Sequence, residues 1–232
     1  MINTDKTYCQ FVKMVSWKRG IMKQILAFGD SNTWGLIPGS TPYERYPWGV
    51  RWTSLLQKKF SDVRVIEEGL CGRTTVFEDE LRPGRKGVDS LQVMLESHYP
   101  VDYAIIMLGT NDCKSYYNVS ARTIGKGIEK CLDILERYLE PQNILLVSPM
   151  ALGEDVWHEE KDPEFSKESV NVSIKLKEVY RSIADKHGVN FLAASDVVKA
   201  SPIDDEHMDA EAHRKFADAV YNELIASARI VA

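Results

Sequence analysis

Short apolar runs alternate with longer segments of helical periodicity along most of the chain, and this alternation restricts the possible folds most strongly. The runs have the length of buried strands and lie at 24–28, 63–66, 103–108, 143–147 and 189–192. Helical spacing of apolar side chains is clearest over 124–139, 172–184 and 212–224. Strands that are apolar at nearly every position are typical of parallel sheets covered on both faces by helices. We therefore expect a single α/β domain over residues 23–232.

The first 22 residues do not share this alternation. They lack the continuous apolar stretch of a secretory signal peptide, and Met22 is an alternative start. We interpret residues 1–22 as an extension that precedes the domain. Elsewhere no apolar run approaches the ~20 residues that a membrane-spanning helix needs, so we expect no membrane partner.

Charge and cysteine content exclude several classes of function. Lys and Arg total 29 against 34 Asp and Glu, which gives a formal net charge of −5. A mildly acidic chain of this kind is a poor partner for nucleic acid or an anionic membrane. Cys9, Cys71, Cys113 and Cys131 form no CxxC pair, a pattern that favours free thiols in a reducing compartment and predicts a cytoplasmic protein.

Polar, turn-rich clusters follow the predicted strands, where parallel sheets carry their functional sites. They read GDSNTWG over 29–35, GLCGRT over 69–74, GTND over 109–112 and DDEH over 204–207. Because the carboxyl ends of parallel strands meet at one edge of the sheet, we expect these four clusters to converge.

The residue types in these clusters are those of serine-dependent acyl transfer. The hydroxyl of Ser31 is a weak nucleophile until a base such as His207 takes its proton. Asp204, three residues before His207, can hold the other ring nitrogen and select the tautomer. Backbone N–H groups of Ser31 and Gly72 and the side-chain amide of Asn111 are candidate donors to the oxyanion.

These four blocks resemble, in order and spacing, those of the SGNH (GDSL-type) hydrolases. The diagnostic residues are Ser31, Gly72, Asn111 and His207, and the stretches VRWTSLLQ, VIEEGLCGRTT and IIMLGTNDCK are similar to the bacterial arylesterase/acyltransferase branch. The family's leucine after the serine is replaced by Asn32. Threonine at position 33 stands where the G-x-S-x-G turn of the α/β-hydrolases has its second glycine, which favours the SGNH fold.

The resemblance implies a flavodoxin-like three-layer α/β/α sandwich with a five-stranded parallel sheet. It also implies hydrolysis of small carboxylic esters through an acyl-enzyme, with no cofactor and no metal. Related enzymes pass the acyl group to alcohols or peroxide as well as to water, so acyl transfer is an expected second activity. Carbohydrate O-acetyl esterase, lysophospholipase and thioesterase activities are alternatives within the fold, and a homo-oligomer is expected. Trp34 and Cys71 are candidate pocket residues, and the acidic segment 151–167 is expected to form a lid or an interface.

Three readings from other classes compete with this one. A non-catalytic protein of the same fold would keep the pocket without the chemistry. A metal site in the acidic segment 204–209 has only one histidine, whereas zinc usually has several His or Cys ligands. A nucleotide site is disfavoured because neither G-x-G-x-x-G nor G-x-x-x-x-G-K-[ST] occurs.

The remaining histidines have simpler interpretations than catalysis. His187 is expected to be a core residue at a helix end, His98 a residue that closes a helix, His158 a solvated loop residue, and His213 a member of the last helix. Only His207 lies in a loop that follows a strand and has an aspartate, Asp204, three residues earlier. Asp205 is the alternative partner of the His207 imidazole.

Overall fold

The computed structural model describes residues 22–41 and 43–227. The sequence-based interpretation of residues 1–21, including the free thiol expected at Cys9, lies outside the described residues. Cys71, Cys113 and Cys131 are free thiols, as predicted.

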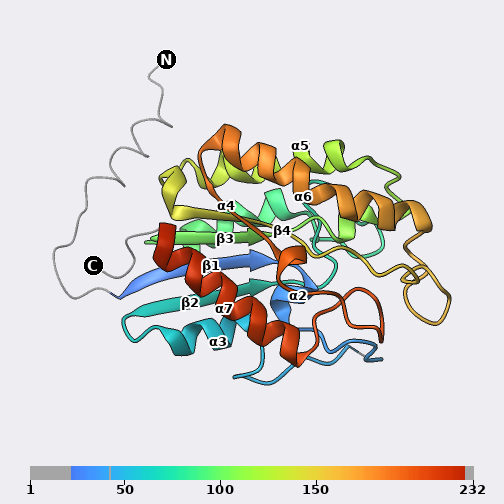
Figure 1. Cartoon of the computed structure of the whole chain (residues 1–232). Helices are drawn as coiled ribbons and strands as arrows, with labels where there is room; N and C mark the ends of the chain where they lie inside the picture. Colours follow the sequence, from blue (N-terminus) through green and yellow to red (C-terminus); the bar gives the residue numbers. More distant parts are fainter. Residues whose placement is uncertain (1–21, 42, 228–232) are drawn as a thin grey trace, which may run out of the picture.

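Five parallel strands form the central sheet, in the order β2-β1-β3-β4-β5 (Figure 1). They are β1 (Lys23–Gly29), β2 (Val63–Gly69), β3 (Tyr103–Met107), β4 (Ile144–Ser148) and β5 (Asn190–Ala193). This is the flavodoxin-like strand order, and the predicted three-layer α/β/α fold is confirmed. The strand β2 runs beyond the end of the apolar run at Ile66, because its pairing with β1 continues to Gly29 opposite Gly69.

Helices cover both faces of the sheet, α4, α5 and α6 on one and α3 and α7 on the other (Figure 1). The helices are α2 (Ser31–Trp34), α3 (Trp52–Lys59), α4 (Gly87–Ser97), α5 (Ala121–Leu135), α6 (Lys167–His187) and α7 (Ala210–Ser227). Successive residues of β1 enter opposite layers of the core, since side chains alternate across a strand. Leu26 packs beneath α4, α5 and α6, whereas Ile25 packs against α3 and α7.

The helix α5 ends at Leu135, although the predicted apolar stripe continued to residue 139. Leu139 is still buried, and its N–H bonds the carbonyl of Leu135, but it lies in a turn. Pro141 disfavours helical geometry at the preceding residue, and Glu140 accordingly has an extended backbone. The apolar spacing therefore predicted the burial of this segment but not its conformation.

The chain adds strands on one side of β1 and then, from β3 onward, on the other side, so the strand order reverses between β1 and β3. These two strands are direct neighbours, paired from Ile25 opposite Tyr103 to Gly29 opposite Met107. In open parallel sheets, ligands bind beyond the carboxyl ends of strands where the winding changes direction. The short helix α2 follows β1 there, and the 3-10 helix η1 (Asn111–Cys113) follows β3. The predicted clusters of Ser31 and Asn111 thus meet at this point. Among the described residues, no helix is both long and apolar enough to cross a membrane.

Candidate active site

Ser31 opens the short helix α2 directly after β1. Asp30 caps this helix, because its carboxylate accepts a hydrogen bond from the N–H of Asn32 at 3.0 Å. Gly35 ends the helix with a left-handed backbone, φ 89°. Burial raises the pKa of Asp30 to about 6. Asp30 therefore braces the turn, and Ser31 is held at its start with only 3% of its surface exposed.

His207 joins Ser31 to Asp204 through its two ring nitrogens. Nε2 lies 2.8 Å from Ser31 Oγ, and Nδ1 lies 2.8 Å from Asp204 Oδ2. The other oxygen of Asp204 accepts hydrogen bonds from the N–H groups of Glu206 and His207, at 3.1 and 3.0 Å. The aspartate therefore organises the loop as well as the imidazole, and the three side chains form the arrangement of a serine triad.

The charges in this loop shift two pKa values in opposite directions. Burial lowers the pKa of His207, but the carboxylates of Glu206 and Asp204 outweigh it and raise this pKa to about 9. Burial disfavours the charged form of Asp204, yet the hydrogen bond and charge of His207 hold its pKa below the usual range. The site is built to stabilise an imidazolium beside an aspartate, which is the state that a general base reaches during catalysis.

Asp205, the competing partner of the imidazole, points away from it. Its carboxylate pairs with Lys161 Nζ at 2.6 Å and accepts the N–H of Asp155 at 3.2 Å. Its backbone is left-handed, with φ 58°, which turns the chain between Asp204 and His207.

Two predicted oxyanion donors lie on the loops after β2 and β3. Gly72 has φ 80°, a conformation that favours glycine. Asn111 Nδ2 donates to the carbonyl of Arg73 at 3.1 Å, which leaves its second N–H available. Within the described part of the chain, the N–H groups of Ser31 and Gly72 donate no hydrogen bond. Three donors are therefore free around the loops that meet at Ser31.

The loops after β2 and β3 are joined by a buried polar contact that sequence reasoning did not identify. Asp112, which is fully buried, accepts hydrogen bonds from the N–H of Thr75 at 3.0 Å and from its hydroxyl. Burial raises the pKa of Asp112 to about 7. Because Thr75 follows Gly72 and Asp112 follows Asn111, this contact links the two loops that carry the candidate oxyanion donors.

The two candidate pocket residues have contacts of their own. The ring of Trp34 faces the guanidinium of Arg45, 5.3 Å from the ring centroid. The Cys71 side chain is half-buried, and burial raises its pKa to about 11, so its thiol is protonated at neutral pH. Their roles in a substrate pocket stay predictions.

The segment 151–167 connects to both sides of the site. Its Lys161 pairs with Asp205 on the His207 loop, and the Gly153 N–H donates to the Asp205 carbonyl at 2.8 Å. At its other end Glu164 pairs with Lys114, which follows the Asn111 loop. Phe165 is buried in the core under α6. The segment therefore holds two loops of the site together, while its predicted function as a lid or an interface stays a prediction.

The other histidines lie in different surroundings. His98 closes α4 and pairs with Glu68 at 2.7 Å, in agreement with its predicted position. His213 is fully buried in α7, and burial lowers its pKa to about 4, so it is neutral. His187 does end α6, but the prediction that it is a core residue is wrong, because its side chain is only partly buried. Its Nδ1 lies 2.7 Å from a Glu136 carboxylate oxygen at the end of α5, so it makes a polar contact between two helices.

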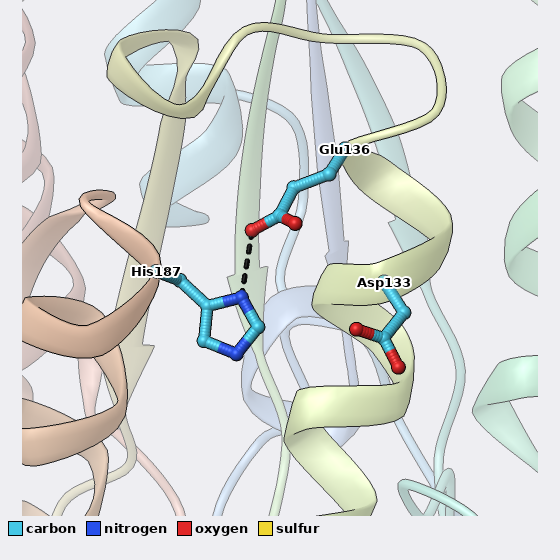
Figure 2. A group of neighbouring side chains, drawn as sticks. All are labelled: Asp133, Glu136 and His187. Atoms are coloured by element: carbon cyan, nitrogen blue, oxygen red, sulfur yellow. Dashed lines mark hydrogen bonds and ion pairs between the residues drawn. The ribbon is translucent and has the colours of Figure 1, made fainter.

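Figure 2 shows this contact together with Asp133. Asp133, Glu136 and His187 form the one group of three ligating side chains within 4.8 Å that the described residues contain. Asp133 and Glu136 lie at the end of α5, before β4, and His187 lies just before β5, so the group is at the amino ends of the strands and at the edge opposite Ser31. Any ion held there would not reach the triad.

Comparison with known families agrees with this geometry. The model of the GDSL-like lipase/acylhydrolase family matches residues 27–215, which include all four polar clusters. The chain belongs to this family. The resemblance to the SGNH hydrolases is thereby confirmed, and this family member is a carboxylic ester hydrolase whose substrates are small-molecule esters.

Solved structures that resemble this chain include named esterases. A carbohydrate acetylesterase from Sinorhizobium meliloti is 34% identical, with a TM-score of 0.81 over 88% of this chain and 99% of that chain. The M. smegmatis aryl esterase is 33% identical, also with a TM-score of 0.81 over 88% of this chain and 99% of that chain. A G-D-S-L family protein from Veillonella parvula, at 14% identity and a TM-score of 0.63, shares the fold. The search of curated proteins gives no match.

Two residues next to the triad were not assigned a role from the sequence. Asn32 was noted only as a departure from the family's leucine, yet its side chain bonds the backbone of Glu206 and Met208. Glu206 was considered only as a metal ligand, and its carboxylate lies 3.7 Å from His207 Nε2. The sequence does carry one sign of the role of Asn32, because it places a polar residue where the family has an apolar leucine.

Proposed function

We propose that Ser31 is the nucleophile of this esterase, His207 its general base and acid, and Asp204 the carboxylate that orients the imidazole. The observation that carries the proposal is the pair of 2.8 Å contacts that His207 makes with Ser31 Oγ and Asp204 Oδ2. Hydrogen bonds of this length let a proton pass from the hydroxyl to the ring as the oxygen attacks.

The reaction then follows from these contacts. The proton of Ser31 moves to His207 Nε2 while Oγ bonds to the ester carbonyl carbon. The N–H groups of Ser31 and Gly72 and the amide of Asn111 stabilise the negative oxygen that forms. His207 returns the proton to the alcohol oxygen as the ester bond breaks, which leaves an acyl group on Ser31. Water, activated by the same imidazole, releases the acid and restores the hydroxyl.

Small acetyl and aryl esters are the proposed substrates. The proposal is supported by the similarity to an aryl esterase and to a carbohydrate acetylesterase over nearly the whole length of each. An alcohol or peroxide that enters in place of water would receive the acyl group instead, and the ratio of transfer to hydrolysis is measured from the two products. A cytoplasmic location and a homo-oligomer stay predictions, the second of which light scattering tests directly.

Hydrolysis of p-nitrophenyl acetate tests the assignment of the nucleophile. Ser31→Ala is expected to lower kcat by at least about 10⁴-fold and to abolish labelling by a fluorophosphonate. Ser97→Ala, which changes an exposed serine at the end of α4, serves as the matched control and should retain full activity. Undiminished turnover in folded Ser31→Ala protein would refute the proposal.

Chelation separates this mechanism from a metal-dependent one. The triad needs no ion, so prolonged treatment with EDTA is expected to leave kcat unchanged. Activity that disappears on chelation and returns with Zn²⁺ would favour the metal-dependent alternative.

A further inference from the structure

Glu206 is a buried carboxylate without a hydrogen-bond donor. Its side chain is 7% exposed, and within residues 22–41 and 43–227 no hydrogen bond ends on its carboxylate oxygens. Only its backbone is bonded, through the N–H to Asp204 and through the carbonyl to Asn32. The imidazole of His207 is its one charged partner among these residues, at 3.7 Å and thus beyond hydrogen-bond distance, whereas buried polar groups are nearly always hydrogen-bonded. The carboxylate is therefore available to a group that donates.

The position of this carboxylate points to the substrate. Glu206 Oε1 lies 3.7 Å from His207 Nε2, and that nitrogen lies 2.8 Å from Ser31 Oγ. In the reaction proposed above, Nε2 gives its proton to the alcohol oxygen of the ester. Glu206 therefore lies beside the alcohol portion of a bound substrate, next to the oxygen that leaves.

Apart from the imidazole of His207, no cation of the described residues pairs with Glu206 at bonding distance. Lys114, whose charge acts on Glu206, is engaged by Glu164, and Lys161 is engaged by Asp205. Asp162 and Asp204 add negative charge to the same region. Burial raises the pKa of Glu206 to about 7, and a hydrogen-bond donor on the ligand would stabilise its charged form. Anionic alcohols are disfavoured here, and neutral donors fit.

We propose that Glu206 determines specificity for the alcohol portion of the ester, by accepting a hydrogen bond from a hydroxyl group on the carbon adjacent to the one that bears the ester oxygen. The inference rests on the proposed roles of Ser31 and His207. A hydroxyl at that carbon lies close to the leaving oxygen. The hydroxyl can therefore donate to Glu206 Oε1 while the leaving oxygen accepts the proton of His207 Nε2. Monoesters of polyols have this hydroxyl, whereas simple alkyl and aryl esters leave the carboxylate without a partner.

Matched esters isolate this hydrogen bond. The substrates 2-hydroxyethyl acetate and 2-methoxyethyl acetate have similar electron-withdrawing alcohols, but only the first carries a donor. The wild-type enzyme is expected to hydrolyse the hydroxyl ester with a kcat/KM at least about tenfold higher, because a site that bonds a hydroxyl discriminates against its absence. In Glu206→Leu and Glu206→Met, which lack an oxygen acceptor, the ratio of the two kcat/KM values should fall toward one.

Controls separate this role from a structural one. Glu211→Gln, which changes an exposed glutamate of α7, should keep the wild-type ratio. The Glu206→Met side chain has a length similar to the original, and circular dichroism shows whether this variant is folded even where Glu206→Leu fails to fold. The ratio is also insensitive to the fraction of active enzyme, since both esters are measured on one preparation.

Two results would overturn the proposal. One is a ratio of the two kcat/KM values that folded Glu206→Met protein leaves unchanged, including a ratio that is already near one in the wild type. The other is a larger preference for a cationic ester, acetylcholine over 3,3-dimethylbutyl acetate, which would show that Glu206 acts through charge. Neither result bears on the nucleophile, because the loss of p-nitrophenyl acetate hydrolysis in Ser31→Ala is measured independently.

Discussion

The Oδ1 atom of Asn32 accepts a hydrogen bond from the Met208 N–H at 2.9 Å, across 176 positions of the sequence. The Nδ2 atom of the same side chain donates to the carbonyl of Glu206 at 3.3 Å. One buried amide thus holds the backbone on both sides of His207. Because Asn32 directly follows Ser31, these bonds fix the position of the His207 imidazole relative to the Ser31 hydroxyl.

Asn32→Leu, the residue that the family usually has here, is expected to be harmful in this chain. It leaves the Glu206 carbonyl and the Met208 N–H without partners, which costs about 1–3 kcal/mol of unfolding free energy. A looser His207 loop should lower kcat about tenfold with little change in KM. Urea unfolding and p-nitrophenyl acetate kinetics measure the two effects. Unchanged stability and kcat would show that the amide contacts are dispensable.

Asn111→Ala tests the side-chain donor to the oxyanion. Losing one such donor costs about 2.7–4 kcal/mol of transition-state stabilisation, so kcat should fall by about 10²–10³-fold. Asn171→Ala, an exposed asparagine in α6, is the matched control and should have no effect. A loss of less than threefold in kcat at unchanged KM would exclude Asn111 from the oxyanion site.

The pH dependence of kcat/KM should report the charges around His207. The ring must be neutral to act as a base, and its pKa is raised to about 9, so kcat/KM should rise with pH and level off near that value. Asp30, Asp204 and Glu206 are the carboxylates that raise this pKa. Glu206→Gln removes one of them, disfavours the imidazolium and moves the rise to lower pH. A rise near 6.5 that the substitution does not move would contradict this electrostatic account.

Thr75→Val tests the buried contact between the loops after β2 and β3. The substitution keeps the shape of the side chain but removes the hydroxyl that donates to Asp112. A hydrogen bond to a charged group contributes about 1.5–3 kcal/mol, and the unfolding free energy should fall by that amount. Thr41→Val, at an exposed position in the loop after α2, makes the same chemical change as a control. Equal stability losses in the two variants would mean that the Asp112 contact contributes nothing.

Much of the site could be predicted because its chemistry is local in sequence. Asp204 and His207 are three residues apart, and Asp204 bonds both the ring and the N–H of His207 within one turn. Ser31 and Asn111 each follow a buried strand directly, so a parallel sheet brings them to one edge. The fold was predictable for the same reason, since the apolar runs and their spacing define the strands and most of the helical cover.

Contacts between distant loops could not be predicted. Nothing in the order of residues indicates that Asn32 would bond Met208, that Thr75 would bond Asp112, or that Asp205 would turn toward Lys161. Apolar spacing likewise predicted a core position for His187, where the approach of α5 to α6 places a carboxylate instead.

The sequence alone therefore determined the layers of the fold and the chemical groups at its carboxyl edge, because burial and short-range capping depend on neighbouring residues. The tertiary structure decided which of these groups touch. The 2.8 Å contact between His207 and Ser31, and the buried carboxylate of Glu206 beside it, depend on how the final loop packs over the first turn. That packing is the sum of many contacts between segments far apart in the chain, and no single segment encodes it.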